Sequence, residues 1–346
     1  PGTRRVAPRR MEGQLIEQVA GEQKPMAPGP LGRLISIIDT SRPLVIQAHD
    51  FPDHDAVAAA FALRSLLATY DVEADLCYGG QIQSNSLTEA ISVLDIPIVS
   101  CRGAGLTEAS QLVVVDGFVG NSNITGLPGE VVGVIDHHSP PDESECPFQD
   151  IRPEYGACST MLYEYFRETD RPMERNVATS LLMGLMMDTA FMTRGVRPID
   201  LDAFSNLFFR GDWETGSRIL KNSLSVKDLA VFREAINSCT VAGDFCYVPI
   251  QNETSPEVMA LVADFFLGLR EIHFVVVVEP DRDEYRLSVR SEDSTRPSDV
   301  VIRRALSGIG SGGGHVHMGG GSIPKDLFPG EQRLRKRFLS AMGIEN

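Results

Sequence analysis

Acidic and imidazole side chains are concentrated in one short stretch of the chain, HDFPDHDAVAAAFAL at residues 49–63. Its first seven residues contain His49, Asp50, Asp53, His54 and Asp55. Carboxylates and imidazoles in one place can bind a divalent cation or exchange protons with a substrate. A simpler reading needs no ligand, because Asp53 and Asp55 could cap the helix that the alanine-rich segment predicts.

Further acidic residues follow apolar segments later in the chain. QLVVVDG ends with Asp116 before its glycine, VVGVIDHH ends with Asp136, His137 and His138, and LLMGLMMDTAF carries Asp188. In an open parallel sheet, ligands bind outside the carboxyl ends of the strands, so these clusters are expected to converge. Converging carboxylates repel one another unless a cation lies between them. Asp and His without Cys favour Mn²⁺ or a similar divalent ion over structural zinc.

The elements that must position these residues alternate between strands and helices. From residue 31 to 205, strands such as PLVIQA alternate with helices such as AVAAAFALRSLLATY, which predicts an α/β domain whose parallel sheet is covered on both faces. Residues 206–234 are predicted to form a helical linker. From 235 to 346, the strands HFVVVVEP and YRLSVRS and the helix SDVVIRRALSGIG predict a smaller second α/β domain, with the site in the cleft between the two.

Composition and charge limit the classes of function that the chain could have. The 346 residues suffice for two hydrophobic cores, and no apolar run is long enough for a membrane span, so no membrane partner is expected. The formal charge of −15 offers long nucleic acid no basic track, although ordinary solubility explains it equally well. The six scattered cysteines predict free thiols in a reducing, cytoplasmic compartment.

Residues 1–30 differ from the rest of the chain. They are rich in Arg, Pro and Gly and lack the apolar core of a secretory signal. This segment is therefore predicted to be disordered, either as a tag remnant or as an extension upstream of a start at Met11.

The order of these motifs resembles a known superfamily. HxxxDxD at 49–55, an Asp after a strand at 116, DHH at 136–138 and Asp188 together resemble the DHH phosphoesterases, which include RecJ-like enzymes. YRLSVRS and GSGGGHVHMGGG resemble the S-x-R-S and GGGH signatures of the companion domain called DHHA1. Phe51 and His54 depart from the common pattern. His54 is expected to be a solvent-exposed turn residue, with a phosphate contact as the alternative.

The resemblance implies a role for each matched residue. One metal would be held by His49 and Asp53, a second by Asp55, His137 and Asp188, and both would be bridged by Asp116. His138 would face the scissile phosphate as a catalytic residue beside Asp116, and Asp136 would orient an imidazole from the second shell. Two ions, Mn²⁺ by preference with Co²⁺ or Mg²⁺ as alternatives, would activate one water.

The second domain would hold the far end of the substrate. The residues implied there are Arg290, Ser291, Gly312, Gly313, Gly314 and His315. Glycines allow close approach of a ligand to the backbone, and an arginine offers two parallel hydrogen bonds to a phosphate. The glycine-rich segment is expected to be a loop that contacts the ligand, and a bare glycine run could instead be a flexible linker. The two domains are expected to close around the substrate, with a hinge near residues 206–235.

The resemblance implies a metal-dependent phosphodiesterase that hydrolyses short oligonucleotides, or linear or cyclic dinucleotides, to mononucleotides. NanoRNase-like (oligoribonuclease-type) members of the superfamily act in this way, and 3′-phosphoadenosine 5′-phosphate is a further candidate substrate. The alternatives are an inorganic pyrophosphatase or exopolyphosphatase, and a non-catalytic nucleotide sensor. No long nucleic acid is expected as a partner, and a homodimer is left open.

Overall fold

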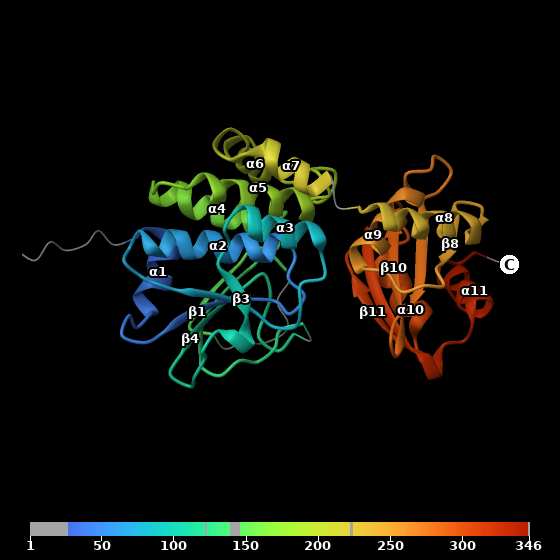
Figure 1. Ribbon diagram of the computed structural model, residues 1–346, viewed down its shortest axis with the longest axis horizontal. Helices are drawn as coiled ribbons and strands as arrows, with labels where there is room; N and C mark the ends of the chain where they lie inside the picture. The colour runs from blue at the N-terminus through green and yellow to red at the C-terminus, as the bar shows by residue number, and fades with distance from the viewer. Residues whose placement is uncertain (1–26, 122, 139–145, 222–223, 345–346) are drawn as a thin grey trace, which may run out of the picture.

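The computed structural model describes residues 27–121, 123–138, 146–221 and 224–344, which form two α/β bodies lying side by side (Figure 1). We call the part from α1 (Gly29–Ile37) to α7 (Trp213–Lys221) the first domain and the part from η2 (Val226–Asp228) to α11 (Glu331–Ala341) the second domain. The segment predicted to be disordered, 1–30, lies outside the described residues as far as residue 26, and its last two residues begin α1 (Gly29–Ile37). No helix in the described ranges is long and apolar enough to span a membrane.

The first domain is built on a parallel sheet of six strands in the order β3-β2-β1-β4-β5-β6. The strands are β1 (Leu44–Ala48), β2 (Asp75–Tyr78), β3 (Ile98–Ser100), β4 (Gln111–Val115), β5 (Glu130–Asp136) and β6 (Phe148–Ile151). The chain starts at β1 in the middle, builds outward to β3, and then returns to β4 on the other side of β1. The sheet order therefore reverses between β1 and β4, where open α/β sheets bind ligands.

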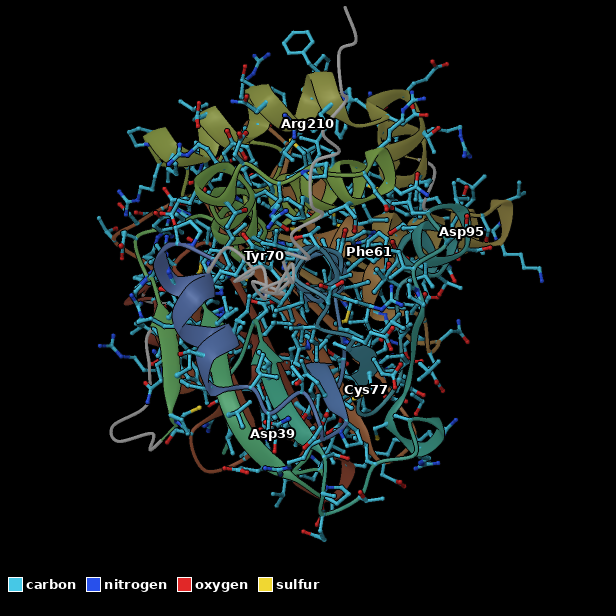
Figure 2. The ribbon with its side chains drawn as sticks, turned by 90° about the vertical axis from the view of Figure 1, so that its left-hand side faces the viewer. Asp39, Phe61, Tyr70, Cys77, Asp95 and Arg210 are labelled. Carbon is cyan, nitrogen blue, oxygen red and sulfur yellow. The ribbon has the colours of Figure 1, made fainter. Side chains whose placement is uncertain are left out.

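All helices described in the first domain contribute to one hydrophobic core on a single face of this sheet (Figure 1). They are α1, α2 (His54–Ala68), α3 (Asn85–Val93), α4 (Cys158–Thr169), α5 (Arg175–Asp188), α6 (Pro198–Arg210) and α7 (Trp213–Lys221). The other face is covered by side chains from connecting segments, such as Phe118, Ile124 and Leu106. The sheet is covered on both faces, as predicted, but helices cover only one. Figure 2 shows α6, with Arg210, as the outermost layer.

The second domain has a mixed sheet of six strands in the order β11-β12-β10-β9-β8-β7. The strands are β7 (Thr240–Ala242), β8 (Phe245–Pro249), β9 (Phe274–Pro280), β10 (Glu284–Ser291), β11 (Ser311–Gly314) and β12 (Met318–Pro324). One face packs on α8 (Leu229–Ser238) and α9 (Pro256–Leu267), and the other packs on α10 (Ser298–Leu306) and α11 (Glu331–Ala341). The 3₁₀ turns are η1 (Cys101–Gly103), η2 (Val226–Asp228) and η3 (Lys325–Leu327).

The glycine-rich segment, expected to be a loop, is an antiparallel hairpin of β11 and β12. Its glycines are required for packing, because a Cβ on Gly312 or Gly321 would lie 2.9 Å from the side chain of Ile302 on α10. Gly314 has a φ of +138°, which other residues rarely adopt. The segment is therefore an ordered edge of the sheet, and its turn at residues 315–317 is held in a fixed place.

Glu257, in the first turn of α9, joins the two domains. Its carboxylate accepts hydrogen bonds from the Asn85 backbone N–H at 2.7 Å and from the hydroxyls of Ser84 at 3.1 Å and Ser86 at 2.6 Å. These groups lie at the start of α3, where unpaired N–H groups favour a negative charge. The boundary predicted at residue 205 lies inside α6, which packs on α5 together with α7.

Candidate active site between the two domains

His49 and Asp53 lie in the turn that joins β1 to α2. One oxygen of Asp53 accepts hydrogen bonds from the backbone N–H groups of Asp55 at 2.9 Å and Ala56 at 3.0 Å, so this carboxylate does cap the helix. Its other oxygen lies 3.9 Å from Nε2 of His49. From the sequence, helix capping and metal binding were alternative roles for Asp53, but its two oxygens allow both.

Asp116 occupies the centre of the site, directly after β4. Its φ of 55° places it in the left-handed region, and its backbone N–H donates to the carbonyl of Ile135 on β5 at 2.9 Å. The side chain is 3% exposed, and its two oxygens face different histidines. Oδ2 lies 3.8 Å from Nε2 of His49, and Oδ1 lies 3.4 Å from Nε2 of His137. Asp116 therefore lies between the residues predicted for the two metals.

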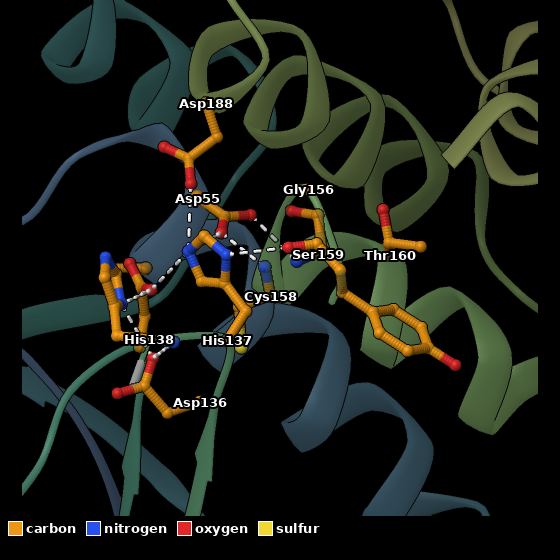
Figure 3. A network of polar contacts seen from close by, with 12 residues as sticks. Asp55, Asp136, His137, His138, Gly156, Cys158, Ser159, Thr160 and Asp188 are labelled. Carbon is orange, nitrogen blue, oxygen red and sulfur yellow. Dashed lines mark hydrogen bonds and ion pairs between the residues drawn. The ribbon is translucent and has the colours of Figure 1, made fainter. Parts of the chain in front are cut away.

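Asp55, His137 and Asp188 form a second group (Figure 3), and His137 is its member beside Oδ1 of Asp116. Asp55 is fully buried and accepts the backbone N–H groups of Cys158 at 2.6 Å and Ser159 at 2.8 Å, at the start of α4. Nε2 of His137 lies 3.0 Å from Asp188 and 3.9 Å from Asp55. Helices α2, α4 and α5 pack together and fix these side chains relative to one another.

Hydrogen bonds to the other ring nitrogens orient both imidazoles of the DHH motif. Nδ1 of His137 lies 3.2 Å from the carbonyl of Tyr155. Because a carbonyl only accepts, Nδ1 must donate, and the lone pair of neutral His137 is then on Nε2, toward the carboxylates. Nδ1 of His138 bonds with Asp136 at 2.9 Å, so Asp136 orients His138 rather than His137.

The electrostatics of the cluster require a positive charge at its centre. Burial raises the pKa of Asp188 to about 6, and burial together with the charges of Asp188 and Asp116 raises the pKa of Asp55 well above its usual value. Burial alone would lower the pKa of His137, but its bonds to Asp116 and Asp188 outweigh burial and raise it. A proton on Nε2 of His137 therefore takes the central position when no cation is bound.

The donor atoms fit divalent cations. Nε2 of His137 and Oδ1 of Asp116 are both buried without a well-directed hydrogen bond. One group of possible ligands consists of His49, Asp53 and Asp116, and another of Asp55, His137 and Asp188, with the ligand atoms of each group within 4.8 Å of one another. Since Asp116 Oδ1 also faces His137, one carboxylate can serve both groups. Oxygen and imidazole donors of this kind suit Mn²⁺, Co²⁺ or Mg²⁺ better than thiolate-seeking ions.

Metal binding is predicted to release protons and to weaken as the pH falls. Groups whose pKa is raised in the metal-free protein hold protons that a cation must displace, so affinity is highest above the pKa of His137 and falls through that pKa and again through about 6, the pKa of Asp188. Calorimetry of Mn²⁺ binding in two buffers with different ionisation heats measures the released protons. Identical heats in both buffers at pH 6 would contradict this arrangement.

A cavity of about 830 Å³ opens above the cluster and extends to the second domain. His315, His317 and Met318 of the β11–β12 turn line it opposite His138. The rings of His138 and His315 stack with centroids 5.5 Å apart, across the boundary between the domains. The structure thus brings His315 to the site, whereas the Gly312, Gly313 and Gly314 backbone supports the turn without lining the cavity.

Two of the residues predicted to bind substrate make contacts within the protein instead of lining the cavity. Arg290 does not line the cavity, since its guanidinium pairs with Asp264 of α9 at 2.7 Å. The phosphate clamp predicted at Arg290 is therefore not formed in this structure. Ser291 is fully buried, and its hydroxyl donates to the backbone carbonyls of Asp293 and Arg296. Its own carbonyl lies 2.9 Å from Nδ1 of His317, so Ser291 positions that ring.

His54 is buried, not exposed as expected from the sequence. Its ring is 5% exposed, and Nε2 lies 3.3 Å from the hydroxyl of Ser86, which in turn donates to Glu257. This imidazole therefore belongs to the contact between the domains. The local sequence did not indicate this burial, because the carboxylate that covers the ring belongs to Glu257 on α9.

Arg194 and Arg197 line the cavity and were missed by the sequence analysis. They lie in TRGVR at residues 193–197, shortly after Asp188 at the end of α5. The sequence feature that could have indicated these cavity residues is a pair of arginines flanking a glycine, in a turn that follows the acidic Asp188.

Comparison with known proteins supports this assignment of domains. The model of the DHH family, N-terminal domain, matches residues 43–185, and the model of the DHHA1 domain matches residues 242–342. An uncharacterized protein of Methanocaldococcus jannaschii is 28% identical over 318 residues, which are 88% of this chain and 65% of that protein. The chain thus spans less than two thirds of that relative.

Two further matches are a probable pyrophosphatase and an exopolyphosphatase-related protein. A probable manganese-dependent inorganic pyrophosphatase of Streptococcus thermophilus is 25% identical over 154 residues, which are 43% of this chain and 49% of that protein. Among solved structures, an exopolyphosphatase-related protein of Bacteroides fragilis superposes with a TM-score of 0.71 at 19% identity, covering 87% of this chain and 92% of that one. At this identity, the structural match shows a shared fold.

Proposed function

Because the chain belongs to the DHH/DHHA1 family of phosphoesterases, we propose that it is a metal-dependent phosphodiesterase that hydrolyses short oligonucleotides or dinucleotides to mononucleotides. The observation that supports this most strongly is the convergence of two groups of metal-binding side chains on Asp116, at the base of a cavity that both domains line. The proposed ions are Mn²⁺, held by His49, Asp53 and Asp116 and by Asp55, His137, Asp188 and the same Asp116.

The residues around the cavity have different roles in the proposed hydrolysis. Bound divalent ions supply a water of lowered pKa and positive charge for the phosphoryl oxygens. In the overall reaction, the oxygen of one water bonds to phosphorus, the ester bond to the leaving nucleoside breaks, and a proton goes to the leaving oxygen. His138 can hold that proton, because the bond to Asp136 and the charge of Asp116 outweigh burial and raise its pKa.

The shape of the cavity favours a nucleotide over an inorganic polyphosphate. Its volume of about 830 Å³ is within the range of sites for organic ligands, and Val316, Met318 and Pro153 add apolar surface beside the histidines. The lining contains two arginines and no lysine, which is few cations for a chain of phosphates. Burial and the charges of His138 and His137 lower the pKa of His315, so its ring is neutral and suited to stack on a base.

Pyrophosphate hydrolysis is the second candidate, since a probable pyrophosphatase is among the relatives over the first domain. Phosphate release from pyrophosphate in Mn²⁺, measured beside dinucleotide cleavage, distinguishes the two. We expect dinucleotide cleavage to be faster. Faster pyrophosphate cleavage would replace the proposed function.

Activity is predicted to fall as the substrate grows beyond about five nucleotides. The cavity is enclosed between two domains on a chain of formal charge −15, so a long strand finds no continuous basic track. The test is a series of RNAs of two to 24 nucleotides in Mn²⁺, together with cyclic dinucleotides, resolved by chromatography. More rapid cleavage of the longest strand than of a dinucleotide would contradict the proposal.

A further inference from the structure

Arg194 and Arg197 are cations of the cavity wall that the proposed metal chemistry does not use. Both line the cavity that contains His49, Asp116 and Asp188, and no carboxylate of the described residues forms an ion pair with either guanidinium. Some arginines outside the cavity are neutralised by carboxylates: Arg152 pairs with Asp150 and Glu164, and Arg296 pairs with Asp244 and Asp293. The two unpaired guanidinium groups are therefore available to an anionic ligand.

An unusual turn fixes the backbone of Arg194 at the wall of this cavity. Three consecutive residues after Thr189, namely Ala190, Phe191 and Met192, have φ of 46°, 57° and 62°. Each left-handed residue other than glycine costs free energy, so such a run persists only where the surrounding contacts fix it. The contacts come from buried Thr189, whose carbonyl accepts the Arg194 N–H at 2.9 Å and whose hydroxyl accepts the Met192 N–H at 3.1 Å.

A buried carboxylate fixes Arg197. Asp200 is 0% exposed, and its Oδ2 accepts the backbone N–H groups of Arg197 at 2.8 Å and Gly156 at 3.1 Å, while its Oδ1 accepts the hydroxyl of Thr160 at 2.6 Å. A Cβ on Gly156 would lie 2.6 Å from Asp200, so only glycine fits there. The neighbouring residue Tyr155 provides the carbonyl that orients His137. Arg197 is thus built into the same framework as the metal cluster.

We propose that Arg194 and Arg197 form a subsite for a second, terminal phosphate of the substrate. This inference rests on the proposed function, in which the scissile phosphate lies at the carboxylate cluster. A guanidinium offers a planar pair of N–H donors that matches a phosphate, and a terminal phosphate carries more charge than an internal diester. The enzyme would then select dinucleotides that carry a terminal 5′- or 3′-phosphate over dinucleoside monophosphates.

The test is equilibrium binding of matched, non-cleavable dinucleotides to the Mn²⁺-loaded protein. The bridging oxygen of the linkage is replaced by a methylene group, and the set carries a 5′-phosphate, a 3′-phosphate or neither. We expect one phosphorylated form to bind at least about tenfold more tightly than the unphosphorylated form, the effect of one charged hydrogen-bonded pair. Arg194→Ala and Arg197→Ala should each lower this ratio toward one without changing metal content, and Arg194→Lys should restore part of it.

Arg210→Ala is the matched control, because Arg210 is exposed at the last residue of α6, about 20 Å along the helix from Arg197 at 1.5 Å per residue. It should leave the ratio unchanged. Equal binding of all three ligands by the unmodified protein, or an unchanged ratio in both alanine variants, would overturn the subsite. Cleavage of natural dinucleotides is measured in parallel. If natural dinucleotides are not cleaved but the phosphorylated ligand still binds more tightly, the proposed reaction is wrong and the subsite stands. If they are cleaved but the ligands bind equally well, the subsite is wrong and the proposed reaction stands.

Discussion

Asp116→Asn is expected to lose bound metal and at least about 10²-fold in turnover, since even residues that only support a metal ligand act on that scale. The substitution removes the charge between His49 and His137 while keeping the size of the side chain. The fold should persist, because Asn tolerates the left-handed backbone that Asp116 adopts with a φ of 55°. Metal analysis, circular dichroism and dinucleotide turnover measure the three effects.

Asp50→Asn provides the control for this experiment. Asp50 lies in the turn between β1 and α2, next to His49, but its carboxylate bonds with the backbone N–H and hydroxyl of Thr125. An asparagine can still accept the N–H bond, so metal content and turnover should stay near normal. If Asp116→Asn also kept near-normal turnover, Asp116 would not be the shared ligand.

The adjacent histidines of the DHH motif are expected to respond differently to alanine. His137→Ala should lose metal, because Nε2 of His137 lies among Asp55, Asp116 and Asp188. His138→Ala should keep most of its metal and lose about 10²-fold or more in turnover, the usual effect of a positioned proton donor or phosphoryl-binding group.

Metal content by mass spectrometry and single-turnover rates separate these two roles. His138→Gln is a useful companion, because an amide can donate a hydrogen bond but cannot transfer a proton. The opposite result, metal loss in His138→Ala and retention in His137→Ala, would mean that the two roles are reversed.

The arrangement of the metal cluster could be predicted from the sequence for a physical reason. Apolar runs such as QLVVVDG mark buried parallel strands, and such strands present their carboxyl ends at one edge of the sheet. Residues that directly follow these strands, including His49, Asp116 and His137, must therefore converge. Their placement requires only strand positions and a common direction, both of which the local sequence indicates.

The contacts that were mispredicted depend on partners far away in the sequence. His54 is buried because Glu257 of the second domain docks on α3, and Arg290 lies outside the cavity because it pairs with Asp264 of α9. The hairpin at residues 311–324 was read as a loop because glycines carry no side chains to show the two-residue period of a strand. The turn at residues 190–192 contains no glycine to indicate its left-handed backbone.

Anomalous diffraction at the manganese absorption edge, from crystals of the full chain grown with Mn²⁺, tests the central claim most directly. The account predicts two peaks in the first domain, one among His49, Asp53 and Asp116 and the other among Asp55, His137 and Asp188, with Asp116 in contact with both. A single peak, or peaks that do not share Asp116, would contradict it.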